Sequence, residues 1–122
     1  MTKSDARILM LRAMAHLIET AHERGIRFIV HEFYRTQERQ NQMVAQRLSK
    51  VSRSQHQDWL AIDLVLLGDK DQAIWTDHPH YHELGKVWRE FHPLCRWGGD
   101  WKSFVDMVHF EISKKWAEWS DP

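Results

Sequence analysis

The distribution of apolar and polar positions along the chain predicts an alternation of helices and short strands. Apolar residues at helical spacing predict four helices, over about residues 5–24, 37–47, 80–92 and 113–119. Short runs rich in β-branched or aromatic residues predict four strands, over residues 26–34, 60–67, 95–97 and 107–112. Helices and short strands in one small chain indicate an α+β fold.

Capping residues and apolar faces define these elements further. The first helix is expected to begin at the N-cap Ser4 and to end before Gly25, which suits a left-handed position. Its apolar positions are Ile8, Leu11, Met14, Leu17, Ile18 and Ala21. Thr36 and Ser113 are the expected caps of the second and last helices. The inward candidates of the second helix are Gln40, Met43 and Val44, and those of the third are Leu84, Val87, Trp88 and Phe91.

Length, charge and cysteine content narrow the class of protein. A chain of 122 residues, 43% of them hydrophobic, suits a single domain spanning residues 1–122. Seventeen basic and seventeen acidic residues balance, so no basic stripe predicts nucleic-acid binding. Cys95 is the only cysteine, which excludes an internal disulfide. No signal-peptide pattern and no apolar run of about 20 residues occurs, so we expect a soluble product made in the cytoplasm.

One carboxylate stands in the middle of the most apolar predicted strand. Burying Asp63 within residues 60–67 is costly unless the carboxylate is paired or binds a metal. The loop over residues 49–57 delivers His56, and the strand over 107–112 carries His109 and Glu111 on the face opposite Val108 and Phe110. Two imidazoles and one carboxylate can hold zinc and leave a position open for water. Spacing alone leaves a metal site and a chance arrangement equally open.

Further polar residues are candidates for chemistry beside such a metal. Asp106 lies three residues before His109 and could act as a base on the water, although an exposed turn aspartate is the simpler interpretation of that residue alone. Arg35 follows a predicted strand and could bind a substrate carboxylate or a developing oxyanion.

Two other histidine motifs give weaker signals. His31-Glu32 does not continue into an HExxH zinc motif, because Arg35 occupies the position of the second histidine. We interpret the histidines of the 76–82 segment as a solvated helix start rather than a metal site. They are His78, His80 and His82.

Several segments together resemble peptidase family M15, the zinc D,D-peptidases and L-alanyl-D-glutamate peptidases. Ser54-x-His56, followed by Ala61 and Asp63, resembles the family signature SxHxxGxAxD. The sequence Asp106-x-x-His109 resembles the second motif, in which an acidic residue precedes the third zinc ligand. Two further segments resemble the upstream arginine segment and the phage endolysin branch, respectively: Tyr34-Arg35-Thr36 with Gln40, and Trp97-Gly98-Gly99-Asp100-Trp101.

The resemblance implies a Hedgehog/D,D-peptidase-like α+β fold, with a small antiparallel sheet packed with helices. It implies zinc held by His56, Asp63 and His109. It makes Asp106 the catalytic acid/base, and makes Arg35 and Ser54 candidates for substrate binding, with Arg35 also stabilising the transition state. The chain departs from the family at Trp59, where glycine is usual, and at Phe33, which stands near a family glycine.

The leading functional expectation is a zinc peptidase of the endolysin type that hydrolyses the peptide stem of peptidoglycan at the L-Ala–D-Glu bond. Such an enzyme would be a monomer made in the cytoplasm of a phage host, acting on the cell wall after release without inserting into a membrane. Two alternatives remain open: a D-Ala-D-Ala carboxypeptidase, and a non-catalytic zinc-stabilised module of a wall-binding protein or virion.

Overall fold

The computed structural model describes residues 1–49 and 53–122 of the chain, and within these ranges it contains three α-helices, five strands and three short 3₁₀ turns. The α-helices are α1 (Lys3–Glu23), α2 (Gln37–Ala45) and α3 (Pro79–Phe91). The strands are β1 (Phe28–Glu32), β2 (Ala61–Leu67), β3 (Ala73–Ile74), β4 (Cys95–Trp97) and β5 (His109–Ile112). The 3₁₀ turns are η1 (Gln55–Asp58), η2 (Gly98–Asp100) and η3 (Lys114–Glu118).

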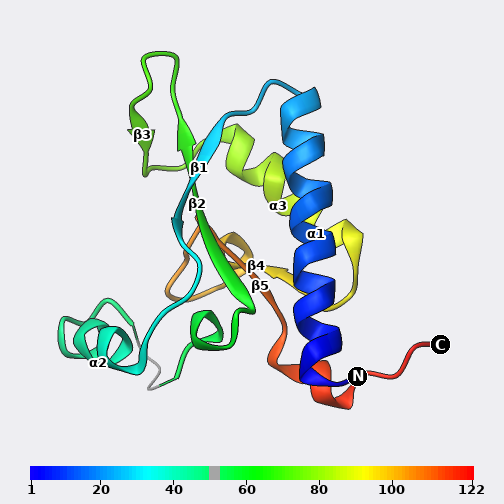
Figure 1. Cartoon of the computed structure of the whole chain (residues 1–122). Coiled ribbons are helices and arrows are strands. Elements are labelled where there is room, and N and C mark those ends of the chain that lie inside the picture. The colour runs from blue at the N-terminus through cyan, green and yellow to red at the C-terminus, as the bar shows by residue number, and fades with distance from the viewer. Residues whose placement is uncertain (50–52) are drawn as a thin grey trace.

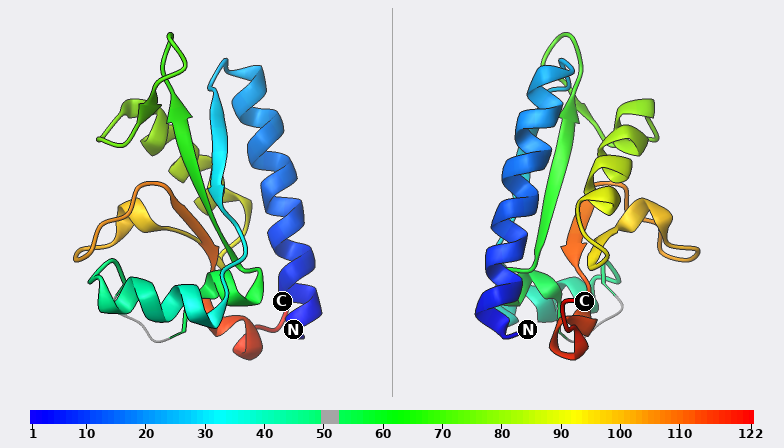
Figure 2. Two further views of the ribbon diagram at one scale, coloured as in Figure 1. Left: turned by 60° about the vertical axis from the view of Figure 1, so that its left-hand side comes forward. Right: turned by 90° about the vertical axis from the view of Figure 1, so that its right-hand side faces the viewer.

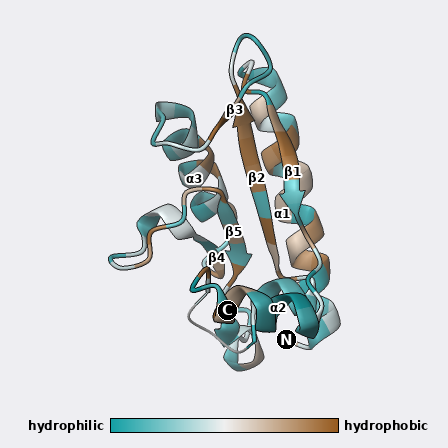
Figure 3. Ribbon diagram, turned by 90° about the vertical axis from the view of Figure 1, so that its left-hand side faces the viewer, coloured by the Kyte–Doolittle hydropathy of each residue, from teal (hydrophilic) through white to brown (hydrophobic). Residues whose placement is uncertain are grey.

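The strands form one antiparallel sheet in the order β1-β2-β5-β4, and the short strand β3 pairs with β2. Helices α1 and α3 lie behind the sheet in Figure 3 and cover one of its faces. Helix α2 lies apart from them, beside one end of β2 and close to η1 (Figure 1). The predicted α+β class, a small antiparallel sheet packed with helices, is therefore confirmed.

Strand β2 is the centre of both the core and the polar face. Its Ile62, Leu64 and Leu66 join the main hydrophobic cluster with residues of α1 and α3. Side chains alternate across a strand, so Asp63 points to the opposite face. In Figure 3 the hydrophobic colouring of β2 is interrupted at its one polar residue. The neighbouring β5 continues the pattern, because Phe110 is buried in the same cluster.

Helix α1 differs from the prediction in its cap and in its buried face. Thr2, not Ser4, is the N-cap, and its hydroxyl accepts a hydrogen bond from the backbone N–H of Asp5 in a reciprocal capping box. The buried residues are Ala6, Leu9, Met10, Ala13, Leu17 and Ala21, whereas Ile8, Leu11 and Ile18 are exposed. The helix carries two apolar stripes, and the one richer in alanine packs inward. Gly25 has the predicted positive φ, at 70°.

The remaining elements follow the predictions with local changes, except for the short strand β3, which was not among the four predicted strands. Thr36 caps α2 as expected, and the helix ends at Ala45, with Gln40 fully buried and Val44 exposed. The predicted loop over residues 49–57 contains the turn η1, and its residues 50–52 lie outside the described part. The last helix is the 3₁₀ turn η3, capped by Ser113. Among the described residues, no helix has the length and apolar character of a membrane span.

The two ends of the chain lie side by side. The N-terminal amino group of Met1 donates a hydrogen bond to the carbonyl oxygen of Trp119 at 2.7 Å, and both views in Figure 2 place the termini together. This contact joins the start of α1 to the end of η3.

Candidate metal centre and cleft

His56 is held so that one ring nitrogen is left facing the polar side of the sheet. Ser54 caps η1, and its hydroxyl accepts a hydrogen bond from the backbone N–H of His56 at 3.1 Å. The ring Nδ1 bonds to the carbonyl oxygen of Phe33 at 2.8 Å, so Nδ1 carries the proton. Nε2 points into the site and is buried with no hydrogen-bond partner among the described residues. An unpartnered buried ring nitrogen of this kind suits a metal ion.

The sheet register brings Asp63 and His109 to the same place. Asp63 of β2 is paired directly with His109 of β5, so their side chains lie on one face. Asp63 Oδ1 lies 3.3 Å from His56 Nε2 and 3.2 Å from His109 Nδ1. One potential ligand atom from each residue lies within 4.8 Å of the others, and the described ranges contain no other group of three or more His, Cys, Asp or Glu residues arranged in this way. The structure thus brings the three predicted ligands together.

These donors fit a divalent cation in chemistry as well as in position. Two imidazoles and one carboxylate form a common zinc ligand set with an open fourth position. Burial would raise the pKa of Asp63, but its contacts with His109 and His56 lower that pKa well below its usual range. Asp63 is therefore ionised at neutral pH and ready to bind a cation.

Glu111 is part of the site, and the sequence analysis gave it no role. Its carboxylate oxygen Oε1 lies 2.7 Å from His109 Nε2, so the imidazole is held between Glu111 and Asp63. Burial lowers the pKa of His109, but the hydrogen bonds to Asp63 and Glu111 outweigh burial and raise it to about 9. The sequence could have indicated this role. His109 and Glu111 are two residues apart on one face of β5, and a metal-bound histidine usually donates its second N–H to a carboxylate or carbonyl.

Asp106 lies in the loop between η2 and β5, where backbone contacts position it. Its N–H donates to the carbonyl oxygen of Gly98 at 3.0 Å, and its own carbonyl accepts from the N–H of His109 at 3.2 Å. A Cβ on Gly98 would lie 2.2 Å from the Asp106 carbonyl oxygen, so only glycine allows this approach. Burial, together with the charge of Asp63, raises the pKa of Asp106. A carboxyl group with a raised pKa is suited to accepting and returning a proton.

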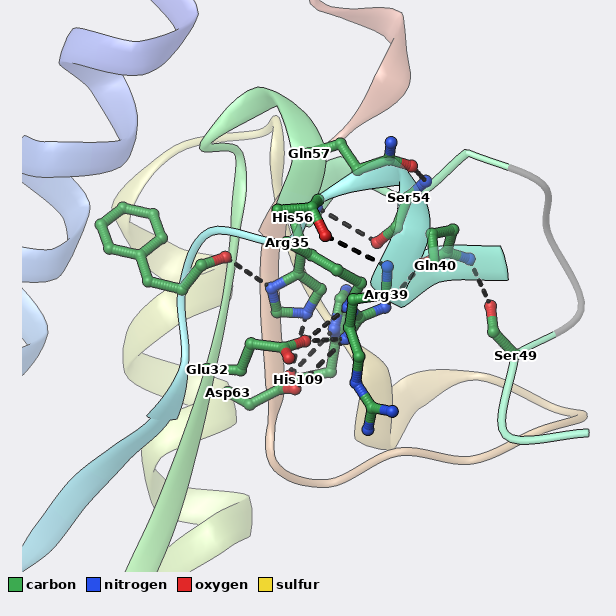
Figure 4. A network of polar contacts seen from close by, with 12 residues as sticks. Glu32, Arg35, Arg39, Gln40, Ser49, Ser54, His56, Gln57, Asp63 and His109 are labelled. Carbon is green, nitrogen blue, oxygen red and sulfur yellow. Dashed lines mark hydrogen bonds and ion pairs between the residues drawn. The ribbon is translucent and has the colours of Figure 1, made fainter. Parts of the chain in front are cut away.

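Arg35 and Ser54 both reach the site, and Figure 4 shows their surroundings. Arg35 is buried, forms an ion pair with Glu32, and donates from Nη1 to Gln40 Oε1 at 2.9 Å. Its Nη2 lies 3.9 Å from Asp63 Oδ2. Gln40 in turn donates to the hydroxyl of Ser49 at 2.9 Å. Glu32, which sequence reasoning considered only as part of an absent HExxH motif, is therefore the counter-ion that allows the arginine to be buried.

The three candidate ligands His56, Asp63 and His109 lie in the wall of an open cleft of about 410 Å³. Its lining residues come from α2 and the segments that flank it, from η1, β2, β4, β5 and η3, and from the loop before β5. The lining includes Arg35, Met43, Leu48, Ser49, Ser54, His56, Asp63, Arg96, Trp101, Phe104, Asp106, His109, Glu111 and Lys114. Trp59, which stands where the family usually has glycine, is not part of this lining.

The histidines near α3 are not part of this site. His78 is the N-cap of α3, with its Nδ1 accepting from the N–H of His80, and His82 is paired with Asp77 at 2.6 Å. None of the three lines the cleft. Their interpretation as a helix start is confirmed for His78.

Comparison with known proteins agrees with the resemblance to peptidase family M15 that the sequence motifs indicate. A peptidase M15 family model, described as D-alanyl-D-alanine carboxypeptidase, matches residues 47–112. The L-alanyl-D-glutamate peptidase of Listeria phage A118 is 31% identical over 103 residues, which is 84% of this chain and 36% of the phage protein. The peptidoglycan L-alanyl-D-glutamate endopeptidase CwlK of Bacillus subtilis is 27% identical over 124 aligned positions, covering 89% of this chain and 74% of CwlK.

Two solved structures share the fold. The L-Ala D-Glu endopeptidase ChiX of Serratia marcescens superposes with a TM-score of 0.71 at 26% identity, over 85% of this chain and 77% of ChiX. The vancomycin resistance D,D-pentapeptidase VanY, solved as a mutant in complex with Zn(II), has a TM-score of 0.58 at 21% identity, over 84% of this chain and 70% of VanY. Although the chain spans only 36% of the Listeria phage relative, the family model covers more than half of the 122 residues. The chain belongs to peptidase family M15.

Proposed function

We propose that this protein is a zinc-dependent peptidase that hydrolyses the peptide stem of peptidoglycan at the L-Ala–D-Glu bond. The observation that carries the proposal is the convergence of His56, Asp63 and His109 at the wall of an open cleft that also contains Asp106. The bond is suggested by the names of the Listeria phage, Bacillus subtilis and Serratia marcescens proteins. The phage relative supports an endolysin role, in which the protein reaches the wall after release from the host cytoplasm.

In this proposal the three side chains hold the metal, and other residues carry the proton. When bound, zinc would supply a Lewis acid for the scissile carbonyl and lower the pKa of a bound water. Asp106 accepts the proton of the attacking water and returns it to the leaving nitrogen, a task that its raised pKa favours. Glu111 fixes the ring of His109 through Nε2, which leaves Nδ1 directed at Asp63 and the metal position.

Arg35 and Ser54 are proposed to bind the substrate backbone, since both line the cleft beside the ligands. The ion pair with Glu32 and the hydrogen bond to Gln40 fix the guanidinium in place. A fixed donor that needs no reorganisation is suited to stabilising negative charge that develops on the substrate. The hydroxyl of Ser54 also caps η1, so loss of this residue would disturb His56 as well.

Digestion of purified peptidoglycan tests the proposal. Zinc-loaded protein should release new amino termini that belong to glutamate, and mass spectrometry should show stems cut after L-Ala. The family model's description favours a second candidate, a D-Ala-D-Ala carboxypeptidase. That activity would release free D-Ala and shorten each stem by one residue. Absence of any new amino terminus or free amino acid, with zinc bound, would contradict both and favour a non-catalytic module.

A further inference from the structure

The cleft contains two cationic side chains that form no ion pair with a carboxylate in residues 1–49 and 53–122. Besides the two histidines of the metal position, the described lining includes three arginine or lysine side chains, of which Arg35 is neutralised by Glu32. The other two, Arg96 and Lys114, are exposed and have no ion pair among the described residues. The described carboxylates of the cleft, by contrast, face the metal position or are buried beside it: Asp63, Asp106 and Glu111. The two cations are therefore available to a ligand.

The sheet register places Arg96 on the strand next to β5, which carries His109. Directly paired residues share a face, and Arg96 of β4 is paired with Glu111 of β5, which contacts His109. Arg96 therefore lies on β4, one strand away from β5, whose His109 is paired with Asp63 of β2. Lys114 follows β5 at the start of η3 and lines the same cleft.

Arg96 also belongs to the strand that leads into the segment positioning Asp106, and both residues line the cleft. Its strand β4 runs directly into η2, where Gly98 accepts the hydrogen bond from the N–H of Asp106. In the proposed reaction Asp106 protonates the leaving nitrogen. The residue that contributes this nitrogen must therefore lie towards Asp106, and so towards Arg96.

We propose that Arg96 and Lys114 form a subsite for a free carboxylate on the residue that follows the scissile bond. This inference rests on the proposed function. Glutamate has two carboxyl groups, and only one can be joined to the next residue of the stem. The other remains as a charged carboxylate beside the bond that is cut, within reach of a guanidinium that can bind it bidentately. An amidated stem, in which this carboxylate is a neutral amide, lacks the charge that the subsite recognises.

The test compares two stem peptides that differ only in this group, one with the free carboxylate and one with its amide. Wild-type protein should show the lower KM for the carboxylate form. The double substitution Arg96→Gln and Lys114→Gln should raise that KM by about 10- to 100-fold with little change in kcat. It should leave the KM of the amide form unchanged. Lys115→Ala is the matched control, since this neighbouring lysine is exposed and does not line the cleft.

Binding measured without turnover separates failure of the subsite from failure of the function. Calorimetry of zinc-loaded Asp106→Asn with the uncleaved carboxylate peptide should give a Kd that the Arg96 and Lys114 substitutions raise by about 10- to 100-fold. Equal KM values for the two peptides, unchanged in the double variant, would overturn the subsite and leave the peptidase standing. If wild-type protein cleaves neither peptide nor peptidoglycan, the proposed function falls and the subsite falls with it.

Discussion

His109 has both of its ring nitrogens engaged by carboxylates, which sets its charge in the metal-free protein. Nδ1 faces Asp63 and Nε2 faces Glu111, and together they raise the pKa of this buried imidazole to about 9. At neutral pH the ring is therefore protonated, and a bound metal must displace the proton on Nδ1. Metal affinity and the stability of the metal-free chain thus depend on pH in opposite directions.

The metal-free protein should lose stability as the pH rises from about 6.5 to about 9. Because the folded pKa of His109 is raised above the unfolded value of 6.5, its stabilising contribution is complete below about pH 6.5 and is lost as the pH approaches about 9. Urea unfolding in the presence of a chelator, at intervals between pH 6 and 9.5, measures this. The substitution His109→Gln should flatten that part of the profile. A wild-type profile as flat as that of the variant would contradict the assignment.

Trp59 shows why the family favours glycine at its position. Its φ of 61° and ψ of 33° lie in the left-handed region, where a side chain costs energy and glycine does not. Trp59 stacks on Tyr34 with ring centroids 4.6 Å apart and meets Phe33 edge-on at 5.2 Å. These contacts offset the backbone cost, and they lie outside the residues that line the cleft.

The glycine and alanine variants of Trp59 should therefore differ in stability in the opposite direction from that at most positions. Trp59→Gly should be more stable than Trp59→Ala by about 1 kcal/mol, because both lose the stacking but only glycine relieves the left-handed backbone. Thermal or urea unfolding of the two variants provides the comparison. At Trp75, which is also exposed and has no positive φ, alanine should equal or exceed glycine in stability. The same order at both positions would contradict this explanation.

The predicted site residues divide by what determines them. The candidates His56, Asp63, His109 and Asp106 could be predicted from the resemblance of their segments to family motifs, whereas spacing alone left a chance arrangement equally open. The partners Glu111 and Glu32 could not, because their roles depend on sheet register and on the path of the chain after β1. Cross-strand pairing is determined by the whole fold, so it cannot be predicted from the spacing of residues within one segment.

Among the elements, the strands could be predicted more reliably than the faces of the helices. Strand β2 is apolar except for Asp63, so both its existence and its buried carboxylate follow from the sequence. Helix α1 has apolar residues on two sides, and periodicity alone did not distinguish the stripe of Ile8, Leu11 and Ile18 from the one that is buried. The small side chains of Ala6 and Ala13 allow close packing, a property that hydrophobicity does not measure.

Catalytic activity should be most sensitive to a small substitution at the junction between η2 and the loop that carries Asp106. Gly98→Ala introduces a methyl group at 2.2 Å from the Asp106 carbonyl oxygen, so the loop must move. Displacement of Asp106, the proposed acid/base, should lower kcat on a stem peptide by about 100-fold, the cost expected when catalytic groups shift by about 1 Å. Steady-state kinetics measures the loss. Gly25→Ala is a control in which a Cβ meets nothing within 4 Å, although its positive φ should cost some stability. Unchanged kcat in Gly98→Ala would show that the loop position does not matter.

At the scale of the whole molecule, the ligands join segments that are far apart in the chain. His56 lies on η1, Asp63 on β2 and His109 on β5, so a metal that binds all three binds only the folded state. A ligand specific to the native state stabilises it by mass action. The predicted fold class is confirmed by this arrangement, and the central strands β2 and β5 each carry one of the proposed ligands.

Zinc should therefore raise the midpoint of thermal unfolding. The stabilisation should reach about 2.7 kcal/mol when free zinc exceeds its Kd 100-fold, and a chelator should reverse it. Differential scanning calorimetry with and without zinc gives the shift. His78→Ala should keep the full shift, because that histidine caps α3 and lies outside the ligand cluster. An equal loss of the shift in His78→Ala and His56→Ala would contradict the assigned ligands.

The most direct measurement is of zinc stoichiometry and peptide hydrolysis on the same samples of wild type, His109→Ala and Asp106→Asn. Wild-type protein should bind one zinc ion and cleave the stem. His109→Ala should lose zinc and activity together, whereas Asp106→Asn should keep zinc with close to wild-type affinity and lose at least about 100-fold in kcat. If Asp106→Asn cleaves as fast as wild type, or if His109→Ala still binds zinc tightly, then the division of this site into metal ligands and an acid/base is wrong.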